Sequence, residues 1–197
     1  MGKRYVMESK INISELKIPG CYLIQSFCTE DSRGRFVKFY HDEIFSSRGI
    51  TLNFKELFYT VSCKKTLRGI HFQEPRHQGK LIHCVKGQIL DLLVDLRNYS
   101  PAFGQWQFIT LDAERPSSVF LPEGIGHAYL ALEDSVVCYC CNELFYAEDD
   151  TGIIWNDEEL NIQWPLDMIG GEKQLILSDK DRTLQTFCQW KKKNNIL

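Results

Sequence analysis

The feature of this sequence that most restricts its fold is a succession of short segments rich in β-branched, aromatic and alternating apolar residues. Such segments are typical of β-strands, because successive side chains of a strand point to opposite faces. Turn-forming residues such as Lys86-Gly87 and Pro122-Glu123-Gly124 separate them. The predicted strands are residues 22–26, 36–40, 58–62, 81–85, 89–96, 106–111, 119–121, 129–132 and 136–141. Many short strands with few helices predict an all-β sandwich or barrel.

Helical structure is predicted in only two places. These are residues 42–47 and the tail after Ser178, where Ser178-Asp179-Lys180-Asp181 is typical of a helix N-terminus. No linker, repeat or low-complexity segment divides the 197 residues, of which 44% are hydrophobic and 25% charged. We therefore predict one globular domain over residues 1–197 with a substantial core.

Charge and cysteine content restrict the class of partner and the compartment. The net charge of −3 comes from 23 basic and 26 acidic residues mixed along the chain, which predicts no nucleic-acid or membrane partner. No segment approaches the roughly 18 apolar residues of a membrane span, and residues 1–14 lack the apolar core of a secretion signal. The eight cysteines include no Cys-x-x-Cys pair, which favours mostly buried thiols over disulfides or a zinc site. We therefore expect a cytoplasmic protein.

The strand at residues 88–96 shows the strongest alternation in the chain. One of its faces carries Leu90, Leu92, Val94 and Leu96. The opposite face carries Ile89, Asp91, Leu93 and Asp95. A mixed face of this kind fits a strand that lines a partly polar cavity, and it fits a half-solvated strand equally well.

The segment 66–80 gathers residue types that suit proton transfer beside an anion. His71 is a candidate base because an imidazole titrates near neutral pH. Arg68 can hold phosphate oxygens bidentately, and Lys80 can stabilise a developing negative charge. Arg68 and His71 are three positions apart and would face opposite sides of a regular strand, so we expect a bulge or bend near Gly69.

An ordered set of motifs resembles the dTDP-4-dehydrorhamnose 3,5-epimerase family, cupin-type enzymes that epimerise nucleotide-linked 4-keto-6-deoxy sugars. Each motif is weak alone, but the set covers most of the chain in the family's order. The motifs are Asp-Ser-Arg-Gly-Arg-Phe (31–36), Leu-Arg-Gly-Ile-His-Phe-Gln (67–73), Gln-Gly-Lys-Leu (78–81), Val-Lys-Gly-Gln-Ile-Leu-Asp (85–91), Val-Asp-Leu-Arg with Ser-Pro-Ala-Phe-Gly (94–104), Leu-Pro-Glu-Gly-Ile-Gly-His-Ala-Tyr (121–129), Gly-Ile-Ile-Trp-Asn-Asp (152–157) and Leu-Ser-Asp-Lys-Asp (177–181). The resemblance implies a cupin jelly roll with a few short peripheral helices. It also implies an isomerase without a cofactor, and a homodimer whose N-terminal strands cross to the partner.

The resemblance implies a role for each of several side chains. His71 would remove a proton next to the C4 ketone of the sugar, with Asp181 holding the imidazole and Lys80 stabilising the enolate. Tyr139 would deliver a proton to the opposite face, since a phenol is protonated at neutral pH. Substrate contacts are implied for Arg33, Phe36, Arg68, Gln73 and His127.

Plainer interpretations compete with these roles. A histidine such as His71 is often a hydrogen-bonded structural group, Tyr139 can be a packed core residue, and Asp181 can cap a helix. Metal-binding cupins usually carry a His-x-His pair followed by a glutamate, but Gln73 stands two positions after His71, so we predict a metal-independent enzyme. A 3,4-ketoisomerase on the same scaffold and a non-catalytic sugar-binding cupin remain alternatives.

The chain departs from the family at two places that bear on the substrate. Common members carry a Gln-x-Asn segment upstream of Leu-Arg-Gly, whereas residues 56–62 here read Glu-Leu-Phe-Tyr-Thr-Val-Ser. Both dTDP-linked and GDP-linked sugars are therefore candidate substrates. Phe145 stands where the family has a second tyrosine, so inversion at C3, at C5 or at both centres is also open.

Overall fold

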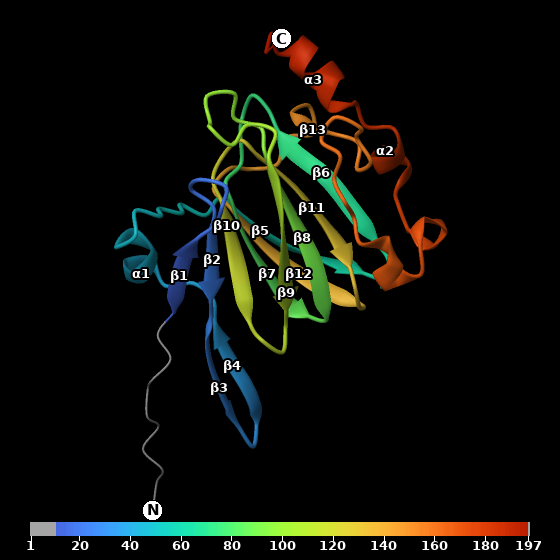
Figure 1. The fold of residues 1–197 in the computed structure, drawn as a ribbon. Coiled ribbons are helices and arrows are strands. Elements are labelled where there is room, and N and C mark those ends of the chain that lie inside the picture. Colours follow the sequence, from blue (N-terminus) through green and yellow to red (C-terminus); the bar gives the residue numbers. More distant parts are fainter. Residues whose placement is uncertain (1–10, 197) are drawn as a thin grey trace, which may run out of the picture.

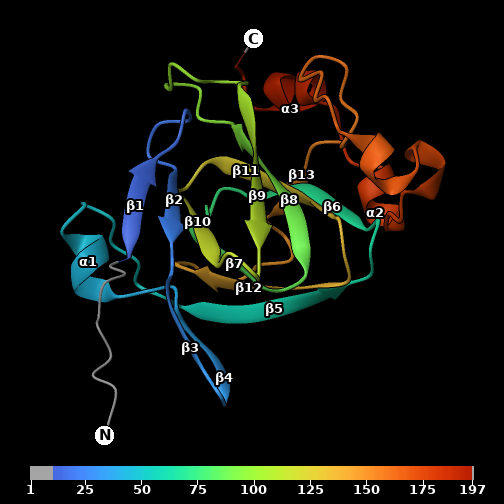
Figure 2. The same ribbon diagram turned by 60° about the horizontal axis from the view of Figure 1, so that its bottom comes forward.

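The computed structural model describes residues 11–196, which form two antiparallel β-sheets packed face to face (Figures 1 and 2). The first sheet has six strands in the order β1-β2-β10-β7-β12-β5, and the second has five in the order β13-β6-β11-β8-β9. Strands β3 and β4 form a separate hairpin that projects from the body of the molecule (Figure 1). This arrangement is the predicted all-β jelly roll of the cupin type.

The strand and helix bounds are as follows. The six-stranded sheet contains β1 (Asn12–Glu15), β2 (Tyr22–Gln25), β5 (Glu56–Ser62), β7 (Lys80–Lys86), β10 (Ser117–Leu121) and β12 (Ser135–Cys141). The five-stranded sheet contains β6 (Leu67–Gln73), β8 (Gln88–Asp95), β9 (Trp106–Asp112), β11 (Ile125–Ala131) and β13 (Asp150–Gly152). The hairpin is β3 (Phe27–Asp31) and β4 (Gly34–Lys38). The α-helices are α1 (Asp42–Ser46), α2 (Asp179–Arg182) and α3 (Phe187–Lys193), and 3₁₀ turns cover Leu166–Ile169 and Glu172–Gln174.

Every predicted strand overlaps an observed one, but four observed strands were not predicted. They are β1, β3, β6 and β13. β6 carries Arg68, Gly69 and His71 among its apolar residues, which breaks the strand pattern, and β13 has only three residues. Register with neighbouring strands, rather than local sequence, therefore defines these elements.

The core has three parts, one between the two sheets and one on the outer face of each sheet. Residues of the sheets' inner faces, including Ile82, Leu93 and Tyr129, pack between them. The C-terminal segment, with Trp155, Trp164 and Trp190, covers the outer face of the five-stranded sheet. The segment around α1, with Phe45, Ile50 and Leu52, covers part of the outer face of the six-stranded sheet.

The packing of the two sheets decides between the two interpretations of the mixed face of β8, a cavity wall or a half-solvated surface. Leu90, Leu92 and Val94 pack under the C-terminal segment, whereas Ile89 and Leu93 point between the sheets. Asp91 and Asp95 lie on that inner face and are fully buried. The mixed face is therefore an interior wall with buried carboxylates and not a solvated surface.

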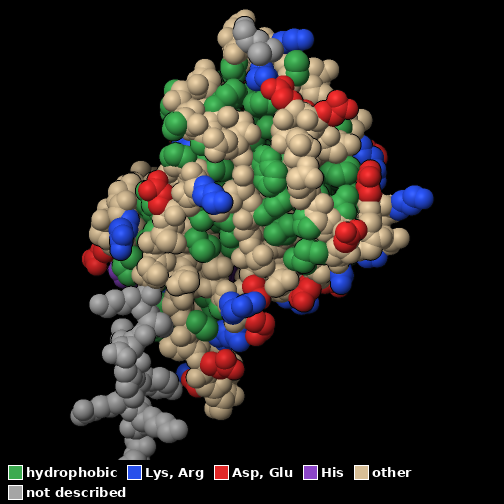
Figure 3. Space-filling view, viewed as in Figure 1, with side chains coloured by type: hydrophobic (Ala, Val, Ile, Leu, Met, Phe, Trp, Pro, Cys, Tyr) green, Lys and Arg blue, Asp and Glu red, His purple; other side chains and the backbone are tan. Residues whose placement is uncertain are grey.

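The surface shows no gathering of one charge sign in the view of Figure 3, where acidic and basic side chains are interspersed. Among residues 11–196, no helix is long and apolar enough to cross a membrane. All eight cysteines are free thiols: four are buried, three are partly exposed, and Cys63 is exposed. The prediction of mostly buried thiols thus holds for half of them.

Candidate active site

A pocket of about 370 Å³ opens between the two sheets, and it collects most of the predicted site residues. Six of them line it: Arg68, His71, Gln73, Lys80, His127 and Tyr139. Glu56, Phe58, Thr60, Gln78, Tyr129, Phe145, Asp150 and Lys180 also contribute to its walls. The volume suits a small-molecule ligand, since such pockets commonly measure about 300–1,000 Å³.

A bulge in β6 turns Arg68 and His71 into the same pocket. His127 of β11 pairs with His71 and Tyr129 pairs with Arg68, so three steps on β6 oppose two on β11. Gly69 occupies the bulge with a φ of 122°, and a Cβ there would lie 2.4 Å from the Cβ of Ala128. Only glycine fits this position. The predicted bend near Gly69 is confirmed.

Asp181 reaches His71 from a distant part of the chain. Its Oδ1 lies 2.5 Å from His71 Nε2, although 110 positions separate the two residues. Ser178 caps α2 as predicted, by accepting a hydrogen bond from the backbone N–H of Asp181. Burial raises the pKa of Asp181, but the hydrogen bonds of its carboxylate with His71 and Ser178 outweigh burial and hold the pKa below its usual value. The carboxylate is therefore ionised beside the imidazole at neutral pH.

Tyr139 lines the pocket from the opposite sheet. It belongs to β12 of the six-stranded sheet, whereas His71 belongs to β6 of the five-stranded one. Phe58 stacks on its ring with centroids 4.8 Å apart and planes 9° apart, which fixes the ring's orientation. Burial raises the pKa of Tyr139 well above its usual value, so the phenol stays protonated at neutral pH.

Lys80 enters the pocket from β7, next to β12 in the same sheet. Among the described residues its ammonium makes no ion pair or hydrogen bond within the chain. Burial lowers its pKa, while the nearby Cys141 and Asp150 oppose that effect. A desolvated cation without a partner is suited to a negative charge that a ligand brings or develops.

Arg68 is tethered without being neutralised. Its Nε donates to Ser62 Oγ at 2.9 Å and its Nη2 to the backbone oxygen of Val61 at 3.3 Å. Within residues 11–196 it has no carboxylate partner. Its remaining N–H groups are available to a ligand, and anion binding by Arg68 stays a prediction.

His127 forms a second histidine–carboxylate pair in the pocket wall. Its Nε2 lies 2.6 Å from Asp91 Oδ1, and both side chains are buried. Burial raises the pKa of Asp91, and His127 only partly opposes this. His127 was predicted as a substrate contact, whereas Asp91 was not predicted as a site residue. Its position on the mixed face of β8 was the available signal.

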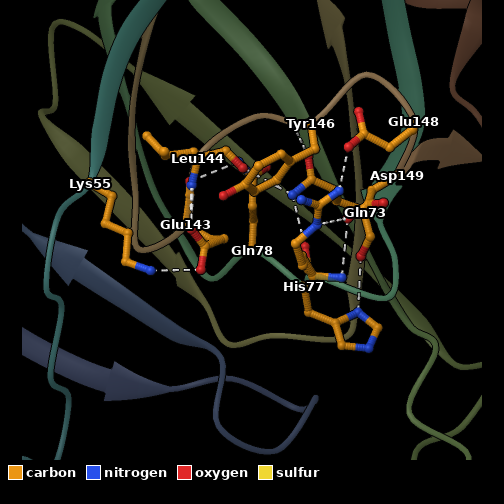
Figure 4. Close-up of polar contacts among 10 residues, drawn as sticks. Lys55, Gln73, His77, Gln78, Glu143, Leu144, Tyr146, Glu148 and Asp149 are labelled. Atoms are coloured by element: carbon orange, nitrogen blue, oxygen red, sulfur yellow. Dashed lines mark hydrogen bonds and ion pairs between the residues drawn. The ribbon is translucent and has the colours of Figure 1, made fainter.

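Gln73 lines the pocket, but its side-chain amide is engaged within the protein. Nε2 donates to the backbone oxygens of Arg76 and Leu144, and Oε1 accepts from the backbone N–H of Tyr146 (Figure 4). The bonds to Leu144 and Tyr146 hold the segment 142–149, whose Phe145 lines the pocket. The geometry thus favours a positioning role for Gln73 over the predicted substrate contact.

The segment 142–149 is held by further contacts on both sides (Figure 4). Lys55 donates to Glu143 at 2.6 Å, and Gln78 donates to the backbone oxygen of Glu143 at 2.9 Å. The guanidinium of Arg76 lies 3.4 Å from the centre of the Tyr146 ring and pairs with Asp149. Tyr146 is thereby directed to Arg76, while Phe145 lines the pocket.

Arg33 and Phe36 lie away from the pocket of their own chain. Both belong to the β3–β4 hairpin, where Arg33 is exposed and pairs with Asp31 at 2.6 Å. Phe36 is 56% exposed and packs edge-on against Phe27. Neither residue lines the pocket described above. Their substrate contacts therefore stay predictions.

The histidines that line the pocket are paired with carboxylates. Within residues 11–196, no three His, Cys, Asp or Glu side chains are grouped so that they could hold a metal ion. The geometry instead offers a paired imidazole on one wall, and a cation and a protonated phenol on the other. The jelly roll is of the cupin type, and its pocket holds groups of the kinds that proton transfer on a bound ligand requires.

Comparisons with known proteins identify the family within that class. The model of the dTDP-4-dehydrorhamnose 3,5-epimerase family matches residues 15–189. The chain is 39% identical over 166 residues to the dTDP-4-dehydrorhamnose 3,5-epimerase of Methanothermobacter thermautotrophicus, covering 84% of this chain and 88% of that one. It is 34% identical over 180 residues to the Shigella flexneri enzyme of the same name, covering 90% and 96%.

Solved structures agree with the sequence relatives. NovW, a 4-keto-6-deoxy sugar epimerase from Streptomyces spheroides, superposes with a TM-score of 0.86 at 31% identity, covering 96% of this chain and 93% of that one. A Legionella pneumophila 3,5-epimerase in complex with dTDP-4-keto-L-rhamnose superposes with a TM-score of 0.84 at 32% identity, covering 90% of this chain and 93% of that one. The chain therefore belongs to the dTDP-4-dehydrorhamnose 3,5-epimerase family and is an epimerase of the isomerase class. The predicted family is confirmed.

Proposed function

We propose that this epimerase acts on a nucleotide-diphospho 4-keto-6-deoxy sugar, with His71 as base and Tyr139 as acid. The observation that carries these roles is their placement on opposite sheets of one pocket. A sugar ring lying between the sheets would have the imidazole on one face and the phenol on the other. Removal of a proton from one face and return of a proton to the other inverts the carbon.

The proton balance assigns each group a step. His71 takes the proton from the carbon next to the C4 ketone, and Asp181 stabilises the imidazolium that results. The electron pair moves onto the ketone oxygen, where the Lys80 ammonium stabilises the enolate. When the enolate collapses, the carbon takes the hydroxyl proton of Tyr139 on the opposite face. Exchange with water then returns both side chains to their starting protonation states.

Two different relatives bear on the nucleotide of the substrate and on the carbon centre that is inverted. The Legionella enzyme holds a dTDP-linked sugar, so we propose a dTDP-linked substrate, with GDP-linked sugars as the second candidate. A 3′-monoepimerase from Streptomyces bikiniensis superposes as well as the 3,5-epimerases do, with a TM-score of 0.82 at 32% identity, covering 92% of this chain and 90% of that one. Overall likeness thus favours neither C3 alone nor both centres.

Mass spectrometry in deuterated water tests substrate and centre together. Incubation with dTDP- and GDP-linked 4-keto-6-deoxy sugars should add one mass unit for each exchanged position, and the substrate that exchanges fastest identifies the nucleotide. Tyr139→Phe should impair product formation more than deuterium uptake, because the base still works without the acid. Equal loss of both would contradict the division of roles. Uptake with none of these sugars would refute the function.

Arg33 and Phe36 would enter the site of a second subunit in a homodimer. The hairpin that carries them projects from the body (Figure 1). Strand β5 presents exposed Leu57, Tyr59 and Val61 on the outer face of its sheet. A second copy could cover this apolar surface while placing its hairpin near the pocket. Residues 1–10, part of the N-terminal region predicted to cross between subunits, lie outside the described residues.

Mixing two inactive variants tests this shared site. A variant with Arg33→Ala and Phe36→Ala lacks the hairpin contacts, and His71→Asn lacks the base. Reassembled in equal amounts, they should recover about a quarter of wild-type activity, because half of the dimers contain one complete site of two. Light scattering should give a dimer. No recovery from a mixture shown to contain mixed dimers would contradict the shared site.

We also propose that residues 1–197 form one domain and work in the cytoplasm. The free thiols support a reducing compartment. Cell fractionation with antibody detection tests the location.

A further inference from the structure

Arg35 ties the projecting β3–β4 hairpin to the body of its own chain (Figure 1). Its Nη1 donates to the backbone oxygen of Ala113 at 2.9 Å, and its Nη2 pairs with Glu114 Oε2 at 2.9 Å. Both partners lie between β9 and β10, 78 and 79 positions further along the chain. One guanidinium therefore bridges the hairpin to the turn that connects the five-stranded sheet with the six-stranded one.

Strand alternation places Arg35 and Phe36 on opposite faces of the hairpin. Glu30 is the register partner of Arg35, and Thr29 is the register partner of Phe36. The face with Arg35 is turned to the body, because the guanidinium reaches residues 113–114 and its side chain is 28% exposed. Phe36 on the other face is 56% exposed. Attachment of one face therefore presents Phe36 outward.

The hairpin needs such an attachment to keep a fixed direction. Among residues 11–196, β3 and β4 pair only with each other, and an isolated two-stranded hairpin is marginally stable in water. The turn of the hairpin is ordered as well, since Arg33 donates from its backbone N–H and its Nη2 to the Asp31 carboxylate at 2.9 and 2.6 Å. A segment that is ordered beforehand loses less conformational freedom when it binds.

The contact of Arg35 is suited to fixing direction more than to stabilising the fold. Glu114 is 81% exposed, and an ion pair with an exposed carboxylate adds little to the free energy of unfolding. The planar guanidinium is nevertheless held by two acceptors, a carboxylate and a backbone carbonyl, which restrict its orientation. The hairpin that carries it is restricted accordingly.

We propose that Arg35 is a positioning residue that directs the hairpin, and with it Arg33 and Phe36, at the pocket of the partner subunit. The inference rests on the proposed function, in which the hairpin enters the site of a second copy. It adds that the β9–β10 turn of one subunit controls substrate binding in the other. A hairpin without a fixed direction weakens binding of substrate and transition state alike, so KM rises while kcat is retained.

Two kinds of mixed dimer, each purified through a different affinity tag on each subunit, test whether Arg35 acts on the partner's pocket. In the first dimer, one subunit carries both Arg35→Ala and His71→Asn, and the other is wild type. The pocket that retains its base then lies in the wild-type subunit and receives the altered hairpin. KM for the nucleotide-linked sugar of the exchange assay should rise about tenfold, as for one lost hydrogen bond. The value of kcat should stay within about twofold.

In the second dimer, one subunit carries Arg35→Ala and the other carries His71→Asn. The pocket that retains its base now lies in the Arg35→Ala subunit and receives an intact hairpin. Its KM should equal that of a dimer with His71→Asn in one subunit and no other change. Because both dimers contain the same two substitutions, a loss of folding stability would affect them alike.

Arg115→Ala is the matched control, because Arg115 lies in the same turn, is 87% exposed and pairs with Asp112 instead of the hairpin. Placed in the first dimer instead of Arg35→Ala, it should leave KM unchanged. Equal KM values in the two Arg35→Ala dimers, or a raised KM in the second dimer alone, would overturn the proposal. If the variant lacking Arg33 and Phe36 fails to complement His71→Asn in mixed dimers, the shared site of the proposed function is refuted instead.

Discussion

The pocket contains two histidine–carboxylate pairs whose histidines lie on neighbouring strands, and the pairs differ mainly in the exposure of the histidine. His71 and His127 are register partners in β6 and β11, and their carboxylates lie 2.5 and 2.6 Å away. The side chains of His71 and Asp181 are 31% and 4% exposed, whereas those of His127 and Asp91 are 6% and 0% exposed. The same pair of residue types therefore occurs twice in one pocket. We call the partly exposed His71–Asp181 pair open and the buried His127–Asp91 pair closed.

The pKa values of the two buried carboxylates shift in opposite directions, because hydrogen bonds outweigh burial at Asp181 and burial dominates at Asp91. Asp181 is buried too, but its bonds to His71 and Ser178 lower its pKa below the usual value. For Asp91 burial dominates and raises the pKa, and its Oδ2 has no hydrogen-bond partner among the described residues. An open histidine with an ionised partner can exchange protons with a ligand. A closed pair is better suited to fixing a wall of the pocket.

The largest expected contrast comes from changing each histidine in turn. His71→Asn should lower deuterium uptake by up to about 10⁴-fold, the upper range for a general base. It should cost less stability than the His127 change, since the His71 side chain is 31% exposed and Asp181 keeps its hydrogen bond with Ser178. His127→Asn should lower uptake only about tenfold, as for one lost hydrogen bond. Its stability loss should reach about 3–5 kcal/mol, because Asp91 then stays buried without its partner. Uptake assays and urea unfolding measure both effects, and equal activity losses would remove the distinction between the pairs.

A second contrast changes the carboxylates. Asp181→Asn should lower kcat by about 10²- to 10³-fold, below the roughly 10⁴-fold known for a buried triad aspartate, because water can partly support His71. Asp91→Asn should change kcat by less than about tenfold and destabilise the fold by about 1–3 kcal/mol, since its amide N–H groups lack acceptors. Steady-state kinetics would measure the changes in kcat, and thermal unfolding would measure the change in stability. A larger kcat loss for Asp91→Asn would give the closed pair the catalytic role.

A third prediction concerns Lys80, the cation proposed to complement the open pair. Because burial lowers its pKa, the ammonium loses its proton as pH rises through a value below the usual 10.5. The alkaline limb of kcat should therefore begin below pH 10.5 and move upward in Lys80→Arg, whose guanidinium stays charged. A limb in the same place in both proteins would assign it to another group.

The smallest expected effect is on stability against pH, and its sign differs between the pairs. Asp181 has a lowered pKa in the folded state, so its contribution is present above its unfolded pKa and is lost as pH falls through the folded pKa. Asp91 has a raised pKa, so its contribution is present below the unfolded pKa and is lost as pH rises through the folded one. The difference in unfolding free energy between the wild type and Asp181→Asn should shrink as the pH falls. The difference between the wild type and Asp91→Asn should shrink as the pH rises toward neutral. Denaturant unfolding from pH 3 to 7 tests the signs, and slopes of equal sign would contradict the assignment.

Most strands could be predicted because their alternation is local, but the site strand β6 could not. Arg68, Gly69 and His71 interrupt its apolar pattern, and only pairing with β11 and β13 makes it a strand. The need for a bend at Gly69 was nevertheless predictable, since two polar side chains three positions apart had to share a face. Asp91 was missed as a site residue because a buried acid on a mixed face resembles a solvated one in sequence.

The sequence by itself determined the residue types, their order, and hence the family and the predicted roles of His71, Lys80, Tyr139 and Asp181. Only the tertiary structure decided which of these side chains meet. His71 and Asp181 come together across 110 positions because α2 packs beside β6, and no local pattern encodes that contact. Burial was likewise decided by the fold. It makes one histidine–carboxylate pair open and the other closed, because the free energy of a charge depends on its surroundings more than on its residue type.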